Sequence, residues 1–276
     1  MGDPLSVWEL LAGGLFILAL AFLAYKSKAI DFLGAAAGVV VTFITFVGGG
    51  VRWLMIMVAF FVTSSVLTRF HYNYKQKLGS AQEKGGTRSW PNTLANGSIS
   101  AAIAFAEYFS HQDLLVIAFL TSVAAAMSDT IATEIGLLSP SKPRLISNLS
   151  RTVEPGTSGG VTPLGEAVSF GSSLGIALLG ALFAIVGRGT SISIVSGAIS
   201  IVVGGVFGST FDSILGATVQ GSRRCVVCGA LTENRRHHGK EATLVKGLSF
   251  IDNNVVNFLG ILSGVVVSVV VYVLIK

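Results

Sequence analysis

The sequence predicts an all-α fold, a membrane bundle of about eight transmembrane helices with both chain termini outside the cytoplasm. The composition and the placement of the charges lead to this fold class. Of 276 residues, 51% are apolar and 12% charged, about half the charged share of ordinary soluble proteins. The mean hydropathy is +0.73, and glycine is enriched at 33 residues. These values exclude a soluble globular domain, so we expect a single integral membrane domain over residues 1–276.

Eight apolar runs have roughly the 17 to 25 residues that a helix needs to cross a bilayer. In chain order they are Val7–Ala24, Phe32–Val47, Val51–Leu67, Thr93–Phe109, Leu114–Leu137, Leu164–Val186, Ser191–Val219 and Val255–Ile275. The second run is short and glycine-rich, and the seventh is long enough to tilt or to break at its glycines. The first is not expected to be a cleavable signal peptide, because its flank is acidic at Asp3 and Glu9 and no small-residue cleavage site ends it.

The basic residues alternate between rich and poor connections. Of the 19 Lys and Arg residues, 16 follow the first, third, fifth or seventh run, and only Arg52, Arg188 and Lys276 lie on the other side. Basic loops stay in the cytoplasm. The pattern therefore predicts four cytoplasmic loops and both termini outside, in a multi-pass protein of a cell or organelle membrane. The net charge of +5 reports this orientation first, and no nucleic-acid partner is expected.

Among the acidic residues within or at the mouth of the apolar runs, four toward the cytoplasmic ends are the candidates: Asp129, Glu134, Asp212 and Asp252. An acid inside a span costs at least ~2.5 kcal/mol, so each is a candidate functional residue. A transporter would more naturally place such groups near the bilayer midplane. The clustering instead predicts a site at the cytoplasmic face.

Spacing separates these acids into different surroundings. Asp129 and Thr133, four residues apart, project from one helix face, whereas Glu134 lies on the flank and need not join the same site. Asp212 lies in a row of glycines at 204, 208 and 216, which lets another helix approach closely. We interpret the glycines as structural and Asp212 as chemical, and depth alone suggests its pairing with Asp129. The alternative for each acid is a hydrogen bond between helices.

Asparagines open the fourth and eighth runs. Asp252 and Asn92 are suited to capping a helix N-terminus. Asn96 and Asn257 lie one turn further in, too deep for capping. They either hydrogen-bond across the bundle or hold a ligand, and Asn253 is a further candidate of the second kind.

The loop between the fifth and sixth runs has the composition of a phosphate site. Glycine permits positive φ, so five consecutive residues can turn their amide and hydroxyl groups into one concavity: Gly156, Thr157, Ser158, Gly159 and Gly160. Thr162 then caps the next helix, whose N-terminus attracts anions. Arg144 and Arg151 can clamp phosphate oxygens. Together with the carboxylates, these groups predict a magnesium-polyphosphate site, although a bare turn is the simpler interpretation of the glycines.

The last cytoplasmic loop, residues 220–251, carries Cys225 and Cys228 at the spacing of a zinc knuckle, with His237 and His238 following. These four residues are candidate Zn²⁺ ligands. The alternative is a reduced turn without a metal, because only one Cys-x-x-Cys is present and the histidines lack the usual three-to-five spacing. In the cytoplasm a structural disulfide is not expected.

The motifs in order resemble the phytyl-phosphate kinase family of integral membrane proteins, which includes transmembrane protein nineteen. They are Arg88-Ser89-Trp90 with Leu94-Ala95-Asn96-Gly97, Ser128-Asp129-Thr130 with Ala132-Thr133-Glu134-Ile135-Gly136, Pro143-Arg144-Leu145-Ile146, Pro155-Gly156-Thr157-Ser158-Gly159-Gly160-Val161-Thr162, Gly208-Ser209 with Asp212-Ser213, and Asp252-Asn253 with Val256-Asn257-Phe258. The resemblance covers a core at residues 88–258, whereas the spans in residues 1–68 match only in hydrophobicity and position. It implies a CTP-dependent kinase that converts a phytyl or geranylgeranyl monophosphate to the diphosphate.

A mechanism follows as a hypothesis. Asp129, Asp212 and Asp252, with Glu134 as a further candidate, would hold Mg²⁺ on the nucleotide phosphates. The 156–160 loop, Arg144 and Arg151 would bind the transferring group. Lys84 and Arg88 are further candidates for phosphate contacts. The acceptor phosphate is already anionic at pH 7, so no strong general base is needed. A nucleotidyltransferase making a CDP-activated lipid would use the same groups, and a transporter is the third possibility.

Overall fold

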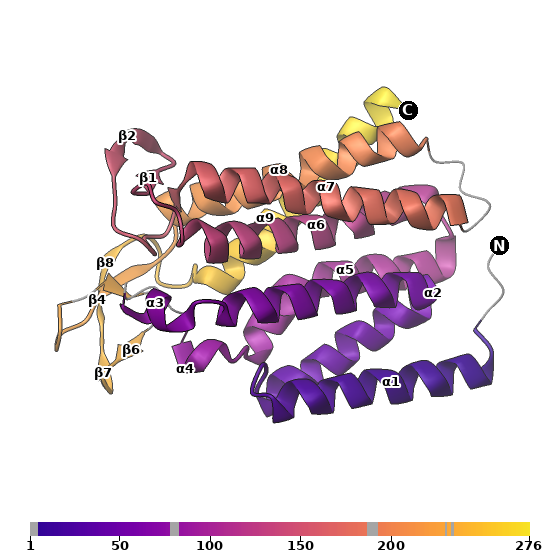
Figure 1. Cartoon of the computed structure of the whole chain (residues 1–276), viewed down its shortest axis with the longest axis horizontal. Helices are drawn as coiled ribbons and strands as arrows, with labels where there is room; N and C mark the ends of the chain where they lie inside the picture. The colour runs from indigo at the N-terminus through magenta and orange to yellow at the C-terminus, as the bar shows by residue number, and fades with distance from the viewer. Residues whose placement is uncertain (1–4, 78–82, 187–192, 230, 233–234) are drawn as a thin grey trace.

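The computed structural model of the chain describes residues 5–77, 83–186, 193–229, 231–232 and 235–276. Most of these residues are helical (Figure 1). The helices are α1 (Val7–Lys26), α2 (Phe32–Arg69), α3 (Tyr72–Lys77), α4 (Glu83–Gly86), α5 (Trp90–Ser110), α6 (Asp113–Gly136), α7 (Pro163–Val186), α8 (Ile194–Thr218) and α9 (Asn253–Ile275). The seven long helices run back and forth along one axis and form a bundle.

Within the described part of the chain, six helices are long and apolar enough to cross a membrane: α1, α2, α6, α7, α8 and α9. The sequence predicts eight spans. Two of them, Phe32–Val47 and Val51–Leu67, fall within the 38 residues of α2. A third, Thr93–Phe109, falls within α5, which does not reach the same apolarity. The seventh predicted span is the continuous helix α8, which does not break at its glycines.

Helix α2 is bent sharply at Gly50. This residue has φ 70° and ψ −167°, a conformation outside the helical region and open almost only to glycine. The ribbon of α2 reverses direction at the right-hand end in Figure 1. Val39 before the bend and Val58 after it pack in one cluster with Ile17 of α1. The two halves of α2 are therefore neighbouring segments of the bundle, as the two separate runs in the sequence predict.

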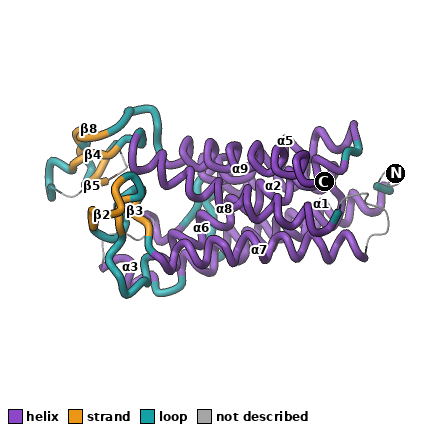
Figure 2. The backbone as a smooth tube through the Cα atoms, turned by 90° about the horizontal axis from the view of Figure 1, so that it is seen from above, coloured by secondary structure: helices purple, strands orange, loops and turns teal. Residues whose placement is uncertain are grey.

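Short strands lie at one end of the bundle, opposite both chain termini (Figures 1 and 2). They are β1 (Arg144–Leu145), β2 (Asn148–Thr152), β3 (Gly160–Val161), β4 (Ser222–Arg224), β5 (Leu231–Thr232), β6 (Arg236–His237), β7 (Lys240–Glu241) and β8 (Thr243–Lys246). They pair in the orders β2-β1-β3, β5-β4-β8 and β6-β7. The all-α prediction omits these sheets, because the two long loops satisfy their backbone groups by antiparallel pairing between mostly exposed segments.

Helix α6 forms the centre of the bundle. It contacts α2, α5, α7, α8 and α9, and every residue from Ile117 to Ala126 is buried. Trp53 of α2 stacks on Phe119 of α6 with ring centroids 3.9 Å apart. The last turns of α6 continue from this buried stretch, and there Glu134 is buried and Asp129 is half-buried.

Helices α8 and α9 approach each other through glycines. A Cβ atom added to Gly204 would lie 2.6 Å from the carbonyl oxygen of Gly264, and one added to Gly208 would lie 2.9 Å from that of Gly260. Both distances are too short for a side chain, so only glycine permits this contact. The predicted packing role of the glycine row is confirmed at these two positions.

Candidate functional site

A small pocket inside the bundle brings Asp129 and Asp212 together. Asp129 comes from α6, Asp212 from α8, Asn96 from α5 and Asn257 from α9, and all four line the same pocket. Side chains fill this pocket closely in the structure. The sequence suggests the pairing of the two aspartates by depth alone, and the structure places both in one pocket.

Asn257 links α9 to Asp212. With its amide nitrogen turned toward α8, the side chain donates to Oδ2 of Asp212 at 3.0 Å and to the carbonyl oxygen of Asn253 at 2.9 Å. Asn96 instead donates from Nδ2 to the carbonyl of Asn92 on its own helix, at 2.9 Å. Of the two deep asparagines, Asn257 therefore makes the hydrogen bond between helices, and it orients the Asp212 carboxylate.

Glu134 lies outside this pocket and belongs to a buried ion pair. Its Oε2 is 2.6 Å from Nζ of Lys75, and both side chains are at most 3% exposed. Lys75 Nζ also donates to the carbonyl of Leu67 at 2.8 Å. The other oxygen, Oε1, is buried and has no hydrogen-bond partner among the described atoms. A metal ion at Glu134 would therefore have to compete with the Lys75 ammonium group, which already binds the carboxylate. The sequence did not indicate this ion pair.

Arg88 brings a second cation to the same region. Burial lowers its pKa to about 10, and the negative charge of Glu134 opposes this shift. The guanidinium carbon lies 6.0 Å from the ring centre of Phe60, within the range of a cation–π contact. The backbone of Arg88 is also fixed, because its N–H donates to Ala29 at 3.0 Å and its carbonyl accepts from Asp31 at 2.9 Å.

An apolar cavity of about 510 Å³ lies between α1, both halves of α2 and α5. Most of its lining is aliphatic or aromatic, for example Leu20, Val58 and Phe61. Its polar lining residues are Ser27, Thr42, Ser65, Arg69, Arg88, Asn92, Thr93 and Asn96. Asn96 thus lines both this cavity and the pocket of Asp129 and Asp212.

The 156–160 loop adopts the glycine conformations that the sequence predicts. Gly156 and Gly159 have φ of 81° and 77°. The Gly160 N–H donates to the Thr157 carbonyl at 2.8 Å, and Thr157 Oγ1 donates to the Glu154 carbonyl at 2.7 Å. The loop packs on the end of α8, where a Cβ on Gly159 would collide with Ala217. Part of its glycine content therefore serves close packing and internal turns.

Thr162 caps α7 as predicted. Its Oγ1 accepts from the Gly165 N–H at 3.0 Å, and Pro163 is the first residue of the helix. Asp252 caps α9 in the same way, since Oδ1 accepts from the N–H groups of Asn254 and Val255, each at 3.0 Å. Capping was one of the two interpretations of Asp252, and the structure shows it. Asn92 lies inside the first turn of α5, where Ser89 is the N-cap residue.

Basic residues of both long loops lie at the strand-bearing end of the bundle (Figure 1). Arg144 in β1 donates from Nη1 to the Leu149 carbonyl at 2.7 Å, and Arg151 lies in the neighbouring strand β2. Lys246 lies in β8 and is exposed, and its pKa is lowered by partial desolvation and then by the positive charge of Arg151. Sequence reasoning missed Lys246, as it missed Lys75, because neither adjoins a motif. Lys84 lies in α4, and its side chain is outside the described atoms.

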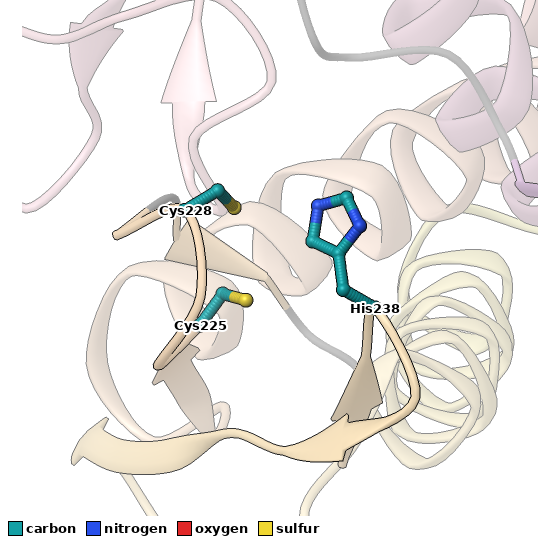
Figure 3. A group of neighbouring side chains, drawn as sticks. All are labelled: Cys225, Cys228 and His238. Atoms are coloured by element: carbon teal, nitrogen blue, oxygen red, sulfur yellow. The ribbon is translucent and has the colours of Figure 1, made fainter.

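The Cys/His loop brings three of its four candidate ligands together. One ligand atom from each of Cys225, Cys228 and His238 lies within 4.8 Å of the others (Figure 3). His237 belongs to β6, but its side chain is outside the described atoms.

Comparison with known proteins gives relatives along nearly the whole chain. Residues 15–265 match the model of a family described as integral membrane protein DUF92. Protein PGR of Arabidopsis thaliana is 32% identical over 266 residues, which cover 88% of this chain and 89% of the relative. An uncharacterized membrane protein of Methanocaldococcus jannaschii is 32% identical over 238 residues, covering 85% and 90%. No solved structure matches the chain.

Proposed function

The chain belongs to the integral membrane protein family DUF92, and from this premise we propose that it is a membrane-embedded phosphotransferase. Its proposed reaction is the CTP-dependent conversion of an isoprenoid monophosphate, of phytyl or geranylgeranyl type, to the diphosphate. The resemblance of residues 88–258 to the phytyl-phosphate kinase family supports the reaction. The proposed topology has eight crossings, with both termini outside and the site at the cytoplasmic face.

One observation carries the proposal, namely that Asn96 lines both the apolar cavity and the pocket of Asp129 and Asp212. An isoprenoid tail needs a long apolar space, and its phosphate needs cations and metal-binding oxygens next to that space. The cavity supplies the apolar space, and Arg69 and Arg88 are among its polar lining residues. A lipid monophosphate with its tail in this cavity would hold its head near both arginines and the two aspartates.

Asp129 and Asp212 are the proposed magnesium ligands. Carboxylate oxygens are the protein ligands that Mg²⁺ prefers, usually one or two together with substrate phosphates and water. In the structure the pocket is filled and Asn257 holds Oδ2 of Asp212. Binding of a metal nucleotide would therefore require these side chains to move, and Asn257 would have to release Oδ2 of Asp212.

Arg144, Arg151 and Lys246 are proposed to bind the nucleotide phosphates. Arg144 and Arg151 lie in the paired strands β1 and β2, and the pKa of Lys246 in β8 is lowered by partial desolvation and then by the positive charge of Arg151. A polyphosphate between them would relieve this repulsion. The acceptor phosphate has a second pKa of about 6 and is already a nucleophile at pH 7. Catalysis would then depend on positioning and on neutralisation of charge in the transition state.

The decisive experiment supplies the purified protein with Mg²⁺, each nucleoside triphosphate in turn and a panel of isoprenoid monophosphates, and identifies the lipid product by mass. We expect the diphosphate with CTP, and label from the γ-phosphate of CTP in the lipid. A CDP-lipid without γ-label would instead show a nucleotidyltransferase, the main alternative. Flux of substrate across proteoliposomes without nucleotide hydrolysis would show a transporter. Either result would overturn the kinase.

A further inference from the structure

The three ligand atoms of Cys225, Cys228 and His238 form a group that the phosphotransferase does not use. They lie within 4.8 Å of one another (Figure 3). Two thiolate sulfurs and an imidazole nitrogen are the ligands that Zn²⁺ prefers. Cys225 is buried, whereas Cys228 and His238 are exposed, so the group lies at the protein surface and solutes can reach it.

The turn between the two cysteines supports a metal-bound thiolate. The N–H of Val227 donates to Sγ of Cys225 at 3.3 Å, and the N–H of Gly229 donates to the Cys225 carbonyl at 2.9 Å. Gly229 has φ 72°, which lets the chain reverse directly after Cys228. Sγ of Cys225 thus accepts a hydrogen bond within its own turn, and the thiolate is the form of cysteine that binds metal.

The segment that carries this group has almost no hydrophobic core. Among the described residues from 219 to 252, Cys225 is the one buried hydrophobic side chain, and all four residues of β8 are exposed. Small segments without a core usually need a disulfide or a metal ion for stability. A metal at Cys225, Cys228 and His238 would meet this need.

The positions of the ligands make the metal a cross-link. Cys225 and Cys228 follow β4, in the sheet β5-β4-β8, whereas His238 lies in the turn of the separate hairpin β6-β7. The same segment connects α8, which carries Asp212, to α9, which carries Asn257. An ion bound by all three residues would join the two sheets and fix the connection between these helices.

We propose that Cys225, Cys228 and His238 bind a structural Zn²⁺ ion that joins the hairpin β6-β7 to the sheet β5-β4-β8. Within the described residues no fourth ligand atom joins the group, so the proposed site is defined by these three ligands. Binding displaces the two thiol protons to solvent. The proposal does not depend on the phosphotransferase activity, because its readout is the metal itself.

The first test measures zinc in the full-length protein, purified in detergent without chelators. We expect about one zinc ion per chain. Both thiols should resist alkylation until a chelator removes the zinc, and then both should react. Replacement of zinc by Co²⁺ should give the near-ultraviolet charge-transfer band of cobalt thiolates. This band is read on the unaltered protein, so the test does not require that any variant folds.

Variants then assign the ligands. Cys225→Ser, Cys228→Ser and His238→Ala should each lower the zinc content at least severalfold and weaken or abolish the cobalt band. His111→Asn is the matched control, because His111 lies at the far end of α5 in a left-handed conformation that asparagine tolerates. This control should keep its zinc.

Three results would overturn the proposal. One is zinc far below one ion per chain, even after the metal-free protein is exposed to Zn²⁺. A second is alkylation of both thiols, or their oxidation to a disulfide, regardless of chelator. The third is full retention of zinc in all three variants.

Discussion

At the scale of single residues, Asp129 and Asp212 are the first to test. The substitutions Asp129→Asn and Asp212→Asn keep the size of each side chain but remove the charge that Mg²⁺ requires. A metal supplies several kcal/mol of charge stabilisation in the transition state, so we expect each variant to lose turnover about a hundredfold or more. The measurement is the rate of diphosphate formation by detergent-purified protein.

The control for these variants is Asp113→Asn. Asp113 is in the first turn of the same helix, α6, but at its opposite end, so this variant should keep its activity. All variants should insert into the membrane and purify as monodisperse protein. Near-normal activity in both Asp129→Asn and Asp212→Asn would remove the metal assignment.

The ion pair of Lys75 and Glu134 makes a prediction about stability. Loss of one partner of a buried pair leaves an uncompensated charge, which typically costs about 3 to 5 kcal/mol. This cost is a large part of the net stability of a typical protein. We therefore expect Lys75→Met to lower the thermal unfolding midpoint strongly. The double variant Lys75→Met with Glu134→Leu should recover part of the loss, because it removes both charges of the pair and leaves only Arg88 without the nearby carboxylate.

An exposed lysine provides the comparison. Lys240 in β7 is exposed, and Lys240→Met should change the unfolding midpoint little. If Lys75→Met were as mild as Lys240→Met, or if the double variant were no better than the single one, the ion pair would not contribute to stability as the geometry indicates.

Sequence alone could predict part of this residue-level arrangement. Asp129 and Asp212 stand out because a charge within an apolar run is rare, and equal depth suggests their contact. Lys75 gives no such signal, because it lies in the short polar segment Tyr72–Lys77, and only the folded chain carries its ammonium group under the bundle. The five-residue offset of Glu134 from Asp129 was the one sign that Glu134 belongs elsewhere.

At the scale of elements, the bend of α2 depends on Gly50. With φ 70° and ψ −167°, this residue occupies a region that other residues rarely adopt. An added Cβ would meet nothing within 4 Å, so the cost of Gly50→Ala is purely conformational, about 1 to 3 kcal/mol. We expect a lower unfolding midpoint for this variant, measured by thermal denaturation in detergent.

Gly171→Ala is the matched substitution for Gly50→Ala. Gly171 lies within α7, and there too an added Cβ would meet nothing within 4 Å. Its backbone is helical, so alanine should be neutral or slightly stabilising there. Equal effects of the two substitutions would show that the bend does not need the special conformation of Gly50.

Elements differ in how well the sequence predicts them. The helices follow from apolar runs of the right length, and Gly48-Gly49-Gly50 between two such runs indicates a break. The strands in residues 144–161 and 222–246 carry no comparable signal, because they are two to five residues long and mostly exposed. Their pairing depends on the surrounding fold, for example on where Pro143 and Gly159 place β1.

At the scale of the whole molecule, charge and architecture agree. The sequence places 16 of 19 basic residues in alternate connections, and the structure gathers the strand-bearing loops at one end of the bundle, opposite both termini (Figure 2). A chain whose two ends lie together must cross the bundle an even number of times. The number of crossings is even when the two halves of α2 count as separate crossings and α5 counts as another.

The orientation of this bundle in the membrane can be tested with cysteine labelling. Ser147→Cys adds an exposed thiol to the strand-bearing end, and Gln112→Cys adds one between α5 and α6 at the opposite end. Since basic loops stay in the cytoplasm, a membrane-impermeant maleimide applied to bacterial spheroplasts that express the protein should label only Gln112→Cys.

The unaltered protein is the control for this labelling. Cys228 is exposed but lies at the basic end, so it should stay unlabelled until the membrane is permeabilised and any bound metal is chelated. Labelling of Ser147→Cys in intact spheroplasts, with protection of Gln112→Cys, would invert the topology and place Asp129 and Asp212 on the side where nucleotides are absent.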